Sequence, residues 1–336
     1  MKHTVLVLVY ILHYVVSNEV INDRPIIGVL AQEQSYYLHT KYPEENYTSY
    51  IAASYVRDVE KSGARVVPIM IGKERSYYEA LMSKINGVLF PGGATYFNQS
   101  NGYADAGEHI LSIAKELNDA GDYFPIFGTC LGFQLIMILE SGRGEVENRG
   151  TCWSFRNLPL HFTEDFRSSK MFSESSADVV DILAHDDVTV NAHQFCIFDE
   201  VSKMFETPVN CKTTCLMILF THTKRSVISL TCLSCVGICL YPFYGVIFHP
   251  EKSSFEWKRS KQYPHSINAV VANRYFMDFF VKECRKSGHT FANEAEENQH
   301  VIYNHEPKFT GLKRRCLNSY SVNIRLRLPM IYILLT

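Results

Sequence analysis

The sequence predicts an α/β protein with a mostly parallel central sheet and helices on both faces. Two observations lead to this prediction. From about residue 25 to residue 140, short apolar runs alternate with segments whose apolar residues recur every three or four positions. The hydrophobic share of 46% also supports a sizeable buried core. Strands that alternate with helices are typical of a parallel sheet covered by helices.

Each element follows from its local pattern. The apolar runs predict strands at residues 26–30, 64–71, 88–90 and 123–127, several of them ended by glycine or proline. Helical spacing predicts a helix over 49–62, others around 110–117 and directly after residue 130, and a long one over 267–284.

One cysteine lies where a strand is expected to turn into a helix. Residues 124–134 read Phe-Pro-Ile-Phe-Gly-Thr-Cys-Leu-Gly-Phe-Gln, with Cys130 at the centre of Gly-x-Cys-x-Gly. We expect the two glycines to permit a sharp turn and to leave room for a substrate beside the thiol. The helix dipole would favour a thiolate there. The alternative is a buried structural cysteine.

A histidine far downstream is the candidate base. Residues 245–251 read Gly-Val-Ile-Phe-His-Pro-Glu, so His249 follows another apolar run. His249 would take and return the thiol proton, and Glu251 would orient its imidazole. Glu251 would otherwise pair with Lys252 or solvent. Because sites form at the carboxyl ends of parallel strands, the Pro-Gly-Gly turn at 91–93, Cys130 and His249 are predicted to share one crevice.

Together these motifs resemble the γ-glutamyl hydrolases (folate polyglutamate hydrolases, peptidase family C26) of the class I glutamine amidotransferase-like superfamily. The matching stretches, spread over residues 24–311, are 24–30, 50–56, 63–68, 85–93, the Cys130 motif and 244–252. The resemblance implies a flavodoxin-like three-layer sandwich. It also implies an omega-peptidase that cleaves folate or antifolate poly-γ-glutamates through a Cys130 thioester. No metal and no organic cofactor is expected, because the cysteine supplies the covalent chemistry.

The resemblance also implies further site residues. Backbone amides of Leu131 and Gly93 would form the oxyanion hole. Gln134 would hold the glutamyl head, and His193 and Tyr55 would contact substrate. Three of these residues have a plainer alternative: an ordinary turn for Gly93, a solvent-facing helix position for Gln134 and a core position for Tyr55.

The resemblance predicts one hydrolase domain over 24–311, with two stretches that depart from the family. Residues 211–240 are irregular and rich in Cys, Thr and Ser, and residues 312–336 form a divergent tail. We interpret both as gene-model errors or divergent splice products. Cys232 and Cys235 have a metal-ligand spacing, but no second ligand pair is evident, so no metal site is predicted.

The N-terminus predicts a secretory signal peptide over residues 1–18. A basic start precedes an apolar run, and Ser17 offers a small residue for cleavage. A buried N-terminal strand is the alternative. Sequons at Asn46 and Asn98 and ten cysteines agree with an oxidising compartment. We therefore expect a secreted or lysosomal glycoprotein.

Charge and hydropathy argue against two other classes, nucleic-acid-binding proteins and membrane-spanning proteins. The 35 acidic and 33 basic residues nearly balance and form no sustained basic block, which argues against nucleic-acid binding. The N-terminal apolar run is shorter than the ~20 residues of a membrane span. The expected partner is a folate poly-γ-glutamate substrate, and a homodimer is expected from the resemblance alone.

Two other functions stay open. A glutaminase-type amidotransferase shares the Cys, His and Glu chemistry, but no second catalytic domain is evident and a secretory signal does not suit it; ammonia release from glutamine would favour it. A catalytically impaired secreted folate-binding relative would result if residues 211–240 misplaced the strand leading to His249. Tight binding without turnover would favour that function.

Overall fold

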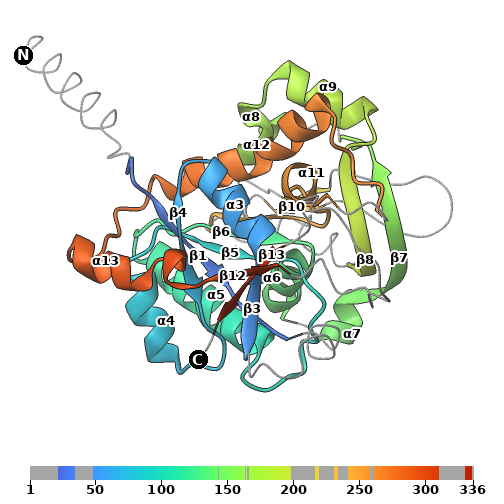
Figure 1. Cartoon of the computed structure of the whole chain (residues 1–336). Coiled ribbons are helices and arrows are strands. Elements are labelled where there is room, and N and C mark those ends of the chain that lie inside the picture. Colours follow the sequence, from blue (N-terminus) through green and yellow to red (C-terminus); the bar gives the residue numbers. More distant parts are fainter. Residues whose placement is uncertain are drawn as a thin grey trace, which may run out of the picture.

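Five parallel strands form the central sheet in the order β11-β6-β5-β1-β4 (Figure 1). They are β1 (Ile26–Leu30), β4 (Arg65–Ile69), β5 (Val88–Phe90), β6 (Ile126–Thr129) and β11 (Phe243–Val246). Every neighbouring pair runs parallel. Nearly every residue of these strands is buried, which explains their continuous apolar runs. The predicted parallel sheet is confirmed.

The structure is a computed structural model. It describes residues 22–34, 48–142, 144–162, 164, 166–197, 216–218, 231–233, 241–257, 261–309 and 330–334. The predicted signal peptide, Asn46 and most of the stretches 211–240 and 312–336 lie outside the described residues.

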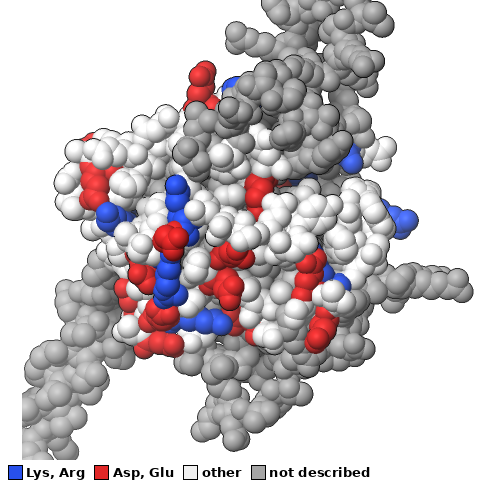
Figure 2. Space-filling model, turned by 90° about the horizontal axis from the view of Figure 1, so that it is seen from below, with Lys and Arg blue, Asp and Glu red and all other residues white. Residues whose placement is uncertain are grey.

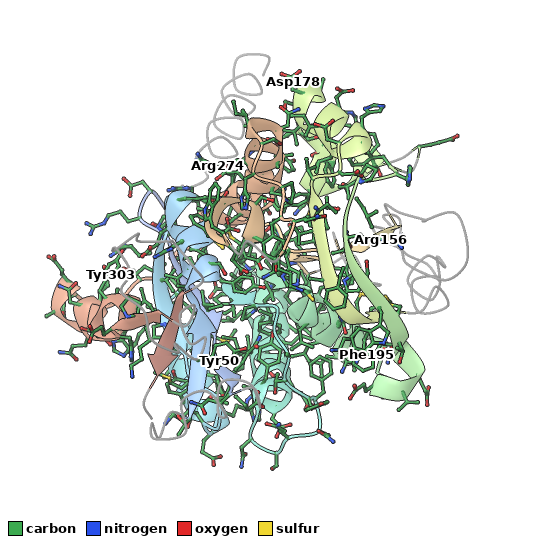
Figure 3. All side chains as sticks on the ribbon, turned by 45° about the vertical axis from the view of Figure 1, so that its right-hand side comes forward. Tyr50, Arg156, Asp178, Phe195, Arg274 and Tyr303 are labelled. Atoms are coloured by element: carbon green, nitrogen blue, oxygen red, sulfur yellow. A yellow bond between two sulfur atoms is a disulfide. The ribbon has the colours of Figure 1, made fainter. Side chains whose placement is uncertain are left out.

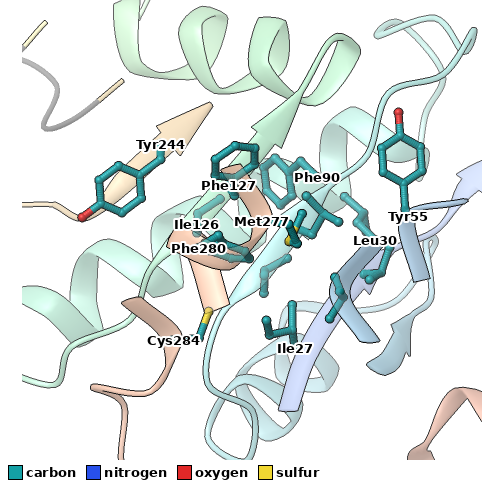
Figure 4. Close-up of a cluster of buried hydrophobic side chains, with 14 of the residues drawn as sticks. Ile27, Leu30, Tyr55, Phe90, Ile126, Phe127, Tyr244, Met277, Phe280 and Cys284 are labelled. Atoms are coloured by element: carbon teal, nitrogen blue, oxygen red, sulfur yellow. The ribbon is translucent and has the colours of Figure 1, made fainter. Parts of the chain in front are cut away.

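Helices cover both faces of the sheet. Neighbouring positions of β5 and β6 point to opposite sides: Phe127 packs against Phe280 at 5.4 Å between ring centroids, whereas Phe90 faces Gly107. Figure 4 shows part of this core, with Phe127, Phe280 and Phe90 labelled. The helices of the Phe127 side are α3 (Ala53–Lys61) and α12 (Ile267–Cys284), and those of the other side are α4 (Arg75–Met82), α5 (Tyr103–Asp119) and α6 (Leu131–Ser141). The predicted three-layer arrangement is confirmed.

A two-stranded antiparallel sheet lies at one end of this sandwich (Figure 1). It pairs β7 (Arg149–Leu158) with β8 (Thr189–Ile197), and its register shifts between Thr151 and Ser154. We call it the β7–β8 hairpin, although residues 159–188, with η1, α8 and α9, connect its two strands. The disulfide Cys152–Cys196 joins the two strands beside that irregularity.

Shorter elements complete the described fold. A second sheet has the order β12-β13-β3-β2, and a third pairs β10 with β9. The remaining strands are β2 (Gln32–Glu33), β3 (Ser49–Ala52), β9 (Leu216–Ile218), β10 (Thr231–Leu233), β12 (Pro307–Phe309) and β13 (Met330–Leu334). The remaining helical elements are α7 (Glu145–Asn148), η1 (Phe166–Ser168), α8 (Lys170–Ser173), α9 (Ala177–His185), α11 (Lys252–Phe255), α13 (Glu294–His300) and η2 (Ile302–Asn304).

The expected helix over residues 49–62 is wrong in its first four residues. Residues Ser49–Ala52 form β3, and α3 begins only at Ala53. β3 pairs with β2 on one side and with β13 on the other. These long-range backbone hydrogen bonds override the helical spacing, which counted Ala52 as its first position.

Charges of both signs are present on one face of the protein. In the view of Figure 2, acidic and basic side chains lie interspersed among uncharged ones. Among the helices that the structure describes, none is long and apolar enough to cross a membrane.

Candidate active site

Cys130 lies at the turn between β6 and α6. Its backbone has φ 50° and ψ −102°, in the left-handed half of conformational space that non-glycine residues rarely adopt. Two hydrogen bonds hold this turn: the Cys130 amide donates to the Val246 carbonyl at 2.8 Å, and the Gln134 amide donates to the Cys130 carbonyl at 3.0 Å. The side chain is only 4% exposed and lies at the N-terminus of an 11-residue helix.

We had expected the glycines of this motif to leave space for a substrate, and this expectation is wrong. A Cβ on Gly132 would lie 2.0 Å from the carbonyl oxygen of Phe90, and one on Gly128 would lie 2.6 Å from the amide nitrogen of Phe133. Both glycines therefore allow backbone to approach backbone. The strained φ belongs to Cys130 itself.

His249 follows β11 and is held beside this turn. β11 pairs with β6 in continuous register, from Phe243 opposite Ile126 to Val246 opposite Thr129. The His249 amide donates to the Val190 carbonyl of β8 at 2.9 Å. The strand leading to His249 is therefore in place, whatever the irregular stretch before it contributes.

Glu251 orients the His249 ring. Its Oε1 lies 2.8 Å from His249 Nδ1 and 3.5 Å from the Nζ of Lys252, so both contacts considered from the sequence are present. Glu251 is fully buried and His249 is 6% exposed. With Nδ1 occupied by the carboxylate, Nε2 is the ring atom available for proton exchange.

Opposite charges set the protonation of this pair. Burial alone would lower the pKa of His249, but negative charge at Cys130 and Glu251 and a hydrogen bond to Cys130 raise it to about 10. Burial alone would raise the pKa of Glu251, but the positive charges of His249 and Lys252 lower it. The geometry favours an imidazolium beside an ionised carboxylate.

Tyr55 joins the same cluster from α3. Its hydroxyl lies 3.3 Å from His249 Nδ1 and accepts a hydrogen bond from the Gly92 amide at 2.9 Å. The ring is 3% exposed and belongs to the core, so the core position is confirmed, and a contact of Tyr55 with substrate stays a prediction. From the other side, Gln32 Nε2 donates to the carbonyls of Pro91 and Gly92 at 3.0 and 3.2 Å.

Gly92 is the point where these groups meet. A Cβ there would lie 2.5 Å from Tyr55 Oη, 2.8 Å from His249 Cε1 and 3.1 Å from Cys130 Cβ. We expect Gly92→Ala to lower kcat by at least about 10²-fold, because a small displacement of positioned groups is costly. The control is Gly288→Ala, which meets nothing within 4 Å. Equal activity of the two variants in a hydrolysis assay would contradict this placement.

A cavity of about 260 Å³ opens beside Cys130. It lies at the carboxyl ends of β5 and β6 and is closed on one side by the β7–β8 hairpin. Its lining residues are Gly93, Ala94, Thr95, Tyr96, Cys130, Leu131, Gln134, Arg149, Phe155, Ala192, His193, Gln194 and Phe195. Cys130, Gly93, Leu131, Gln134 and His193, all singled out from the sequence, therefore line one cavity, and their roles stay predictions.

Gln134 and His193 are buried in the cavity wall. Gln134 is 2% exposed, so the solvent-facing alternative is wrong; its Nε2 donates to the Phe195 carbonyl at 3.3 Å. The ring nitrogens of His193 have no hydrogen-bond partner among the described residues. Burial and then the charge of His249 lower the pKa of His193 to about 4, so its ring is neutral at the pH of most compartments.

Sequence reasoning missed Arg149. It is the first residue of β7 and is 5% exposed, and its Nη1 donates to Gln134 Oε1 at 2.6 Å. The stretch before it contains several charged residues and glycines and resembles a surface loop. No local pattern distinguishes Arg149 from an exposed arginine.

Three potential metal-binding atoms lie together in the hairpin. One atom each of Cys152, His193 and Cys196 falls within 4.8 Å of the other two. The two sulfurs are joined as a disulfide, and a disulfide sulfur is not the thiolate that binds zinc. This group is therefore not a metal ligand set as the structure has it.

Comparison with known proteins gives a consistent result. A family model described as Peptidase C26 matches residues 25–212. The chain is 39% identical to the γ-glutamyl hydrolase of Mus musculus over 86% of this chain and 87% of that protein. It is 35% identical to the γ-glutamyl hydrolase of Homo sapiens, with 86% of each chain covered. It is also 33% identical to γ-glutamyl hydrolase B of Dictyostelium discoideum, over 90% of this chain and 85% of that protein.

Proposed function

Because this chain belongs to the peptidase C26 family, we propose that it hydrolyses the γ-glutamyl amide bonds of folate or antifolate poly-γ-glutamates. One observation carries the proposal. The strained Cys130 turn, the buried His249–Glu251 pair and a cavity meet at the carboxyl ends of β6 and β11. These are the parts of a cysteine acyl-transfer site.

The first half-reaction forms a thioester. The Cys130 thiolate attacks the γ-carbonyl carbon, and the amides of Leu131 and Gly93 hold the resulting oxyanion. The Leu131 amide suits this role because it is the first amide of α6 and has no carbonyl four residues back in the helix. His249 Nε2–H then gives its proton to the amine nitrogen of the departing glutamate, and the C–N bond breaks.

The second half-reaction regenerates the enzyme. Neutral His249 takes a proton from water, and the hydroxide attacks the thioester carbonyl. The C–S bond breaks and the Cys130 thiolate returns, while the product leaves as the γ-carboxylic acid and gives its proton to solvent. Glu251 keeps the ring in the orientation that both proton transfers need, and the Tyr55 hydroxyl contacts the same nitrogen, Nδ1, at 3.3 Å.

The proposal includes a secreted or lysosomal location. Two described features support it: Asn98 is exposed, as a glycosylation acceptor must be, and Cys152 and Cys196 form a disulfide. Mass spectrometry of the protein from its native cells, with and without deglycosylation, tests both the cleavage after residue 18 and the use of Asn46 and Asn98.

The proposal is tested by incubating the signal-cleaved protein with a folate pentaglutamate and separating the products. Shortened folates would support the hydrolase, and the ladder of lengths would separate internal from terminal cleavage. Ammonia release from free glutamine without tail shortening would favour the glutaminase. Binding without any product would favour the impaired folate-binding relative.

The raised pKa of His249 predicts the alkaline limb of the pH profile. His249 must be protonated to act as the acid, and its pKa is raised from 6.5 to about 10. As pH rises through 6.5 the ring keeps its proton, so kcat/KM should stay level there and fall only well above pH 8. Glu251→Gln should move this limb to lower pH, because one of the negative charges that raise the pKa is lost. A wild-type limb centred near pH 6.5 would contradict the ion pair.

A further inference from the structure

Arg149 is a buried cation in the wall of the candidate active site. Its side chain is 2% exposed, although it lines the same cavity as Cys130. The guanidinium carbon lies 4.2 Å from the ring centre of Phe97 and 4.6 Å from that of Phe195. Two aromatic rings therefore contact the guanidinium. In Figure 3, Phe195 is labelled near the end of the hairpin.

The described contacts of Arg149 leave hydrogen-bond donors unused. A guanidinium has five N–H groups. Nε–H and one Nη2–H go to Glu145 Oε1, and one Nη1–H goes to Gln134 Oε1. One N–H on each terminal nitrogen has no partner among the described residues. These two donors belong to a planar group that matches the two oxygens of a carboxylate.

Among the described residues that line the cavity, only Arg149 offers a permanent positive charge to a carboxylate. Among its described lining residues, none is acidic, Arg149 is the only residue with a permanent positive charge, and His193 is neutral. Glu145 balances part of the charge of Arg149, but its side chain is 38% exposed and solvent screens it. The imidazolium of His249 is also near Cys130, but it is paired with Glu251. Among the described residues that line the cavity, an anionic group therefore meets one permanent cation, the buried Arg149.

We propose that Arg149 binds the α-carboxylate of the glutamyl residue that Cys130 attacks, and so selects γ-glutamyl substrates over amides without that carboxylate. The inference rests on the proposed function and names the determinant of its specificity. Gln134 is then a positioning residue, because its amide is fixed between Arg149 and the Phe195 carbonyl. Gln134 is also connected to Cys130, because its backbone amide donates a hydrogen bond to the Cys130 carbonyl in the first turn of α6.

Two substrates that differ only in that carboxylate test the proposal. One is pteroyl-γ-glutamyl-glutamate, and the other replaces the first glutamyl residue with a 4-aminobutyryl residue. We expect wild type to favour the first by about 10- to 100-fold in kcat/KM, the range of a hydrogen bond to a charged group. Arg149→Gln should reduce this preference to within about threefold, by losing activity on the first substrate while keeping activity on the second.

Three further variants test whether the preference depends on the planar donors of Arg149, on its partner Glu145 or on any arginine of β7. Arg149→Lys keeps the charge but not the planar pair of donors, so its preference should be intermediate. Glu145→Gln keeps the guanidinium and should keep the preference. Arg156→Gln is the matched control, because it removes an exposed arginine of the same strand, labelled in Figure 3, and should change neither substrate.

The possible outcomes distinguish a failure of the role of Arg149 from a failure of the proposed function. Equal loss on both substrates in Arg149→Gln, or no preference in wild type, would overturn the role of Arg149. Activity on the second substrate shows that each variant is folded. If wild type cleaves neither substrate, the proposed function fails, and calorimetric binding of the two compounds to Cys130→Ala and Cys130→Ala/Arg149→Gln still tests Arg149.

Discussion

Replacing Cys130 with alanine is expected to lower kcat by about 10⁴- to 10⁶-fold, as happens when the nucleophile of a catalytic unit is removed. Alanine keeps the Cβ that cysteine places at φ 50°, so the strain of the turn does not change. The free energy of unfolding should change by less than about 1 kcal/mol. Product chromatography with a folate pentaglutamate measures the first quantity, and thermal unfolding measures the second.

Cys284→Ala is the matched control. Cys284 is also unpaired, and it is fully buried in the α12 face of the core. Its replacement should cost about 1–2 kcal/mol of stability, because a buried sulfur is lost from the core, and should leave turnover unchanged. Residual hydrolysis by Cys130→Ala above about 1% of wild type would remove the thiol from the mechanism.

Replacing His249 with asparagine is expected to lower kcat by about 10³- to 10⁴-fold. Asparagine retains a polar group beside Glu251 Oε1 but has no proton to exchange with the leaving amine. The imidazolium is also the positive charge next to Cys130. The thiol of His249→Asn should therefore react more slowly with iodoacetamide near neutral pH than that of wild type. A purely structural histidine would not produce this second effect.

His289→Asn serves as the control for His249. His289 is also paired with a carboxylate, since its Nε2 lies 2.7 Å from Asp122, and its Nδ1 contacts the Met82 carbonyl at 2.7 Å. It lines no part of the cavity at Cys130. We expect lower stability and unchanged kcat. Similar kinetic losses in the two variants would mean that His249 acts through the fold and not in the chemistry.

The sequence by itself determined the features that depend on neighbouring residues. Apolar runs predicted the strands of the central sheet, and helical spacing predicted α12 with both of its ends. The Gly-x-Cys-x-Gly motif predicted the turn at Cys130. Each of these signals is local: a strand or helix that buries one surface must repeat apolar residues at its own period.

The β3 strand shows where local patterns failed. Residues 49–52 fit the period of the helix that follows them, yet they pair with β2 and β13. β13 lies about 280 residues further along the chain, and a window of the sequence contains no information about such a partner. Hydrogen bonds to distant strands decided this segment.

Only the tertiary structure decided which side chains meet in the site. The contact between Tyr55 and His249 spans 194 residues, and the hydrogen bond from Arg149 to Gln134 joins a strand of the hairpin to the helix after Cys130. Arg149 occurs in a polar stretch that resembles a surface loop, and packing against Phe97 and Phe195 helps to bury it. The spacing of apolar residues in the sequence indicates which face of a helix or strand is buried. The partner of a buried polar group instead depends on how distant elements pack together.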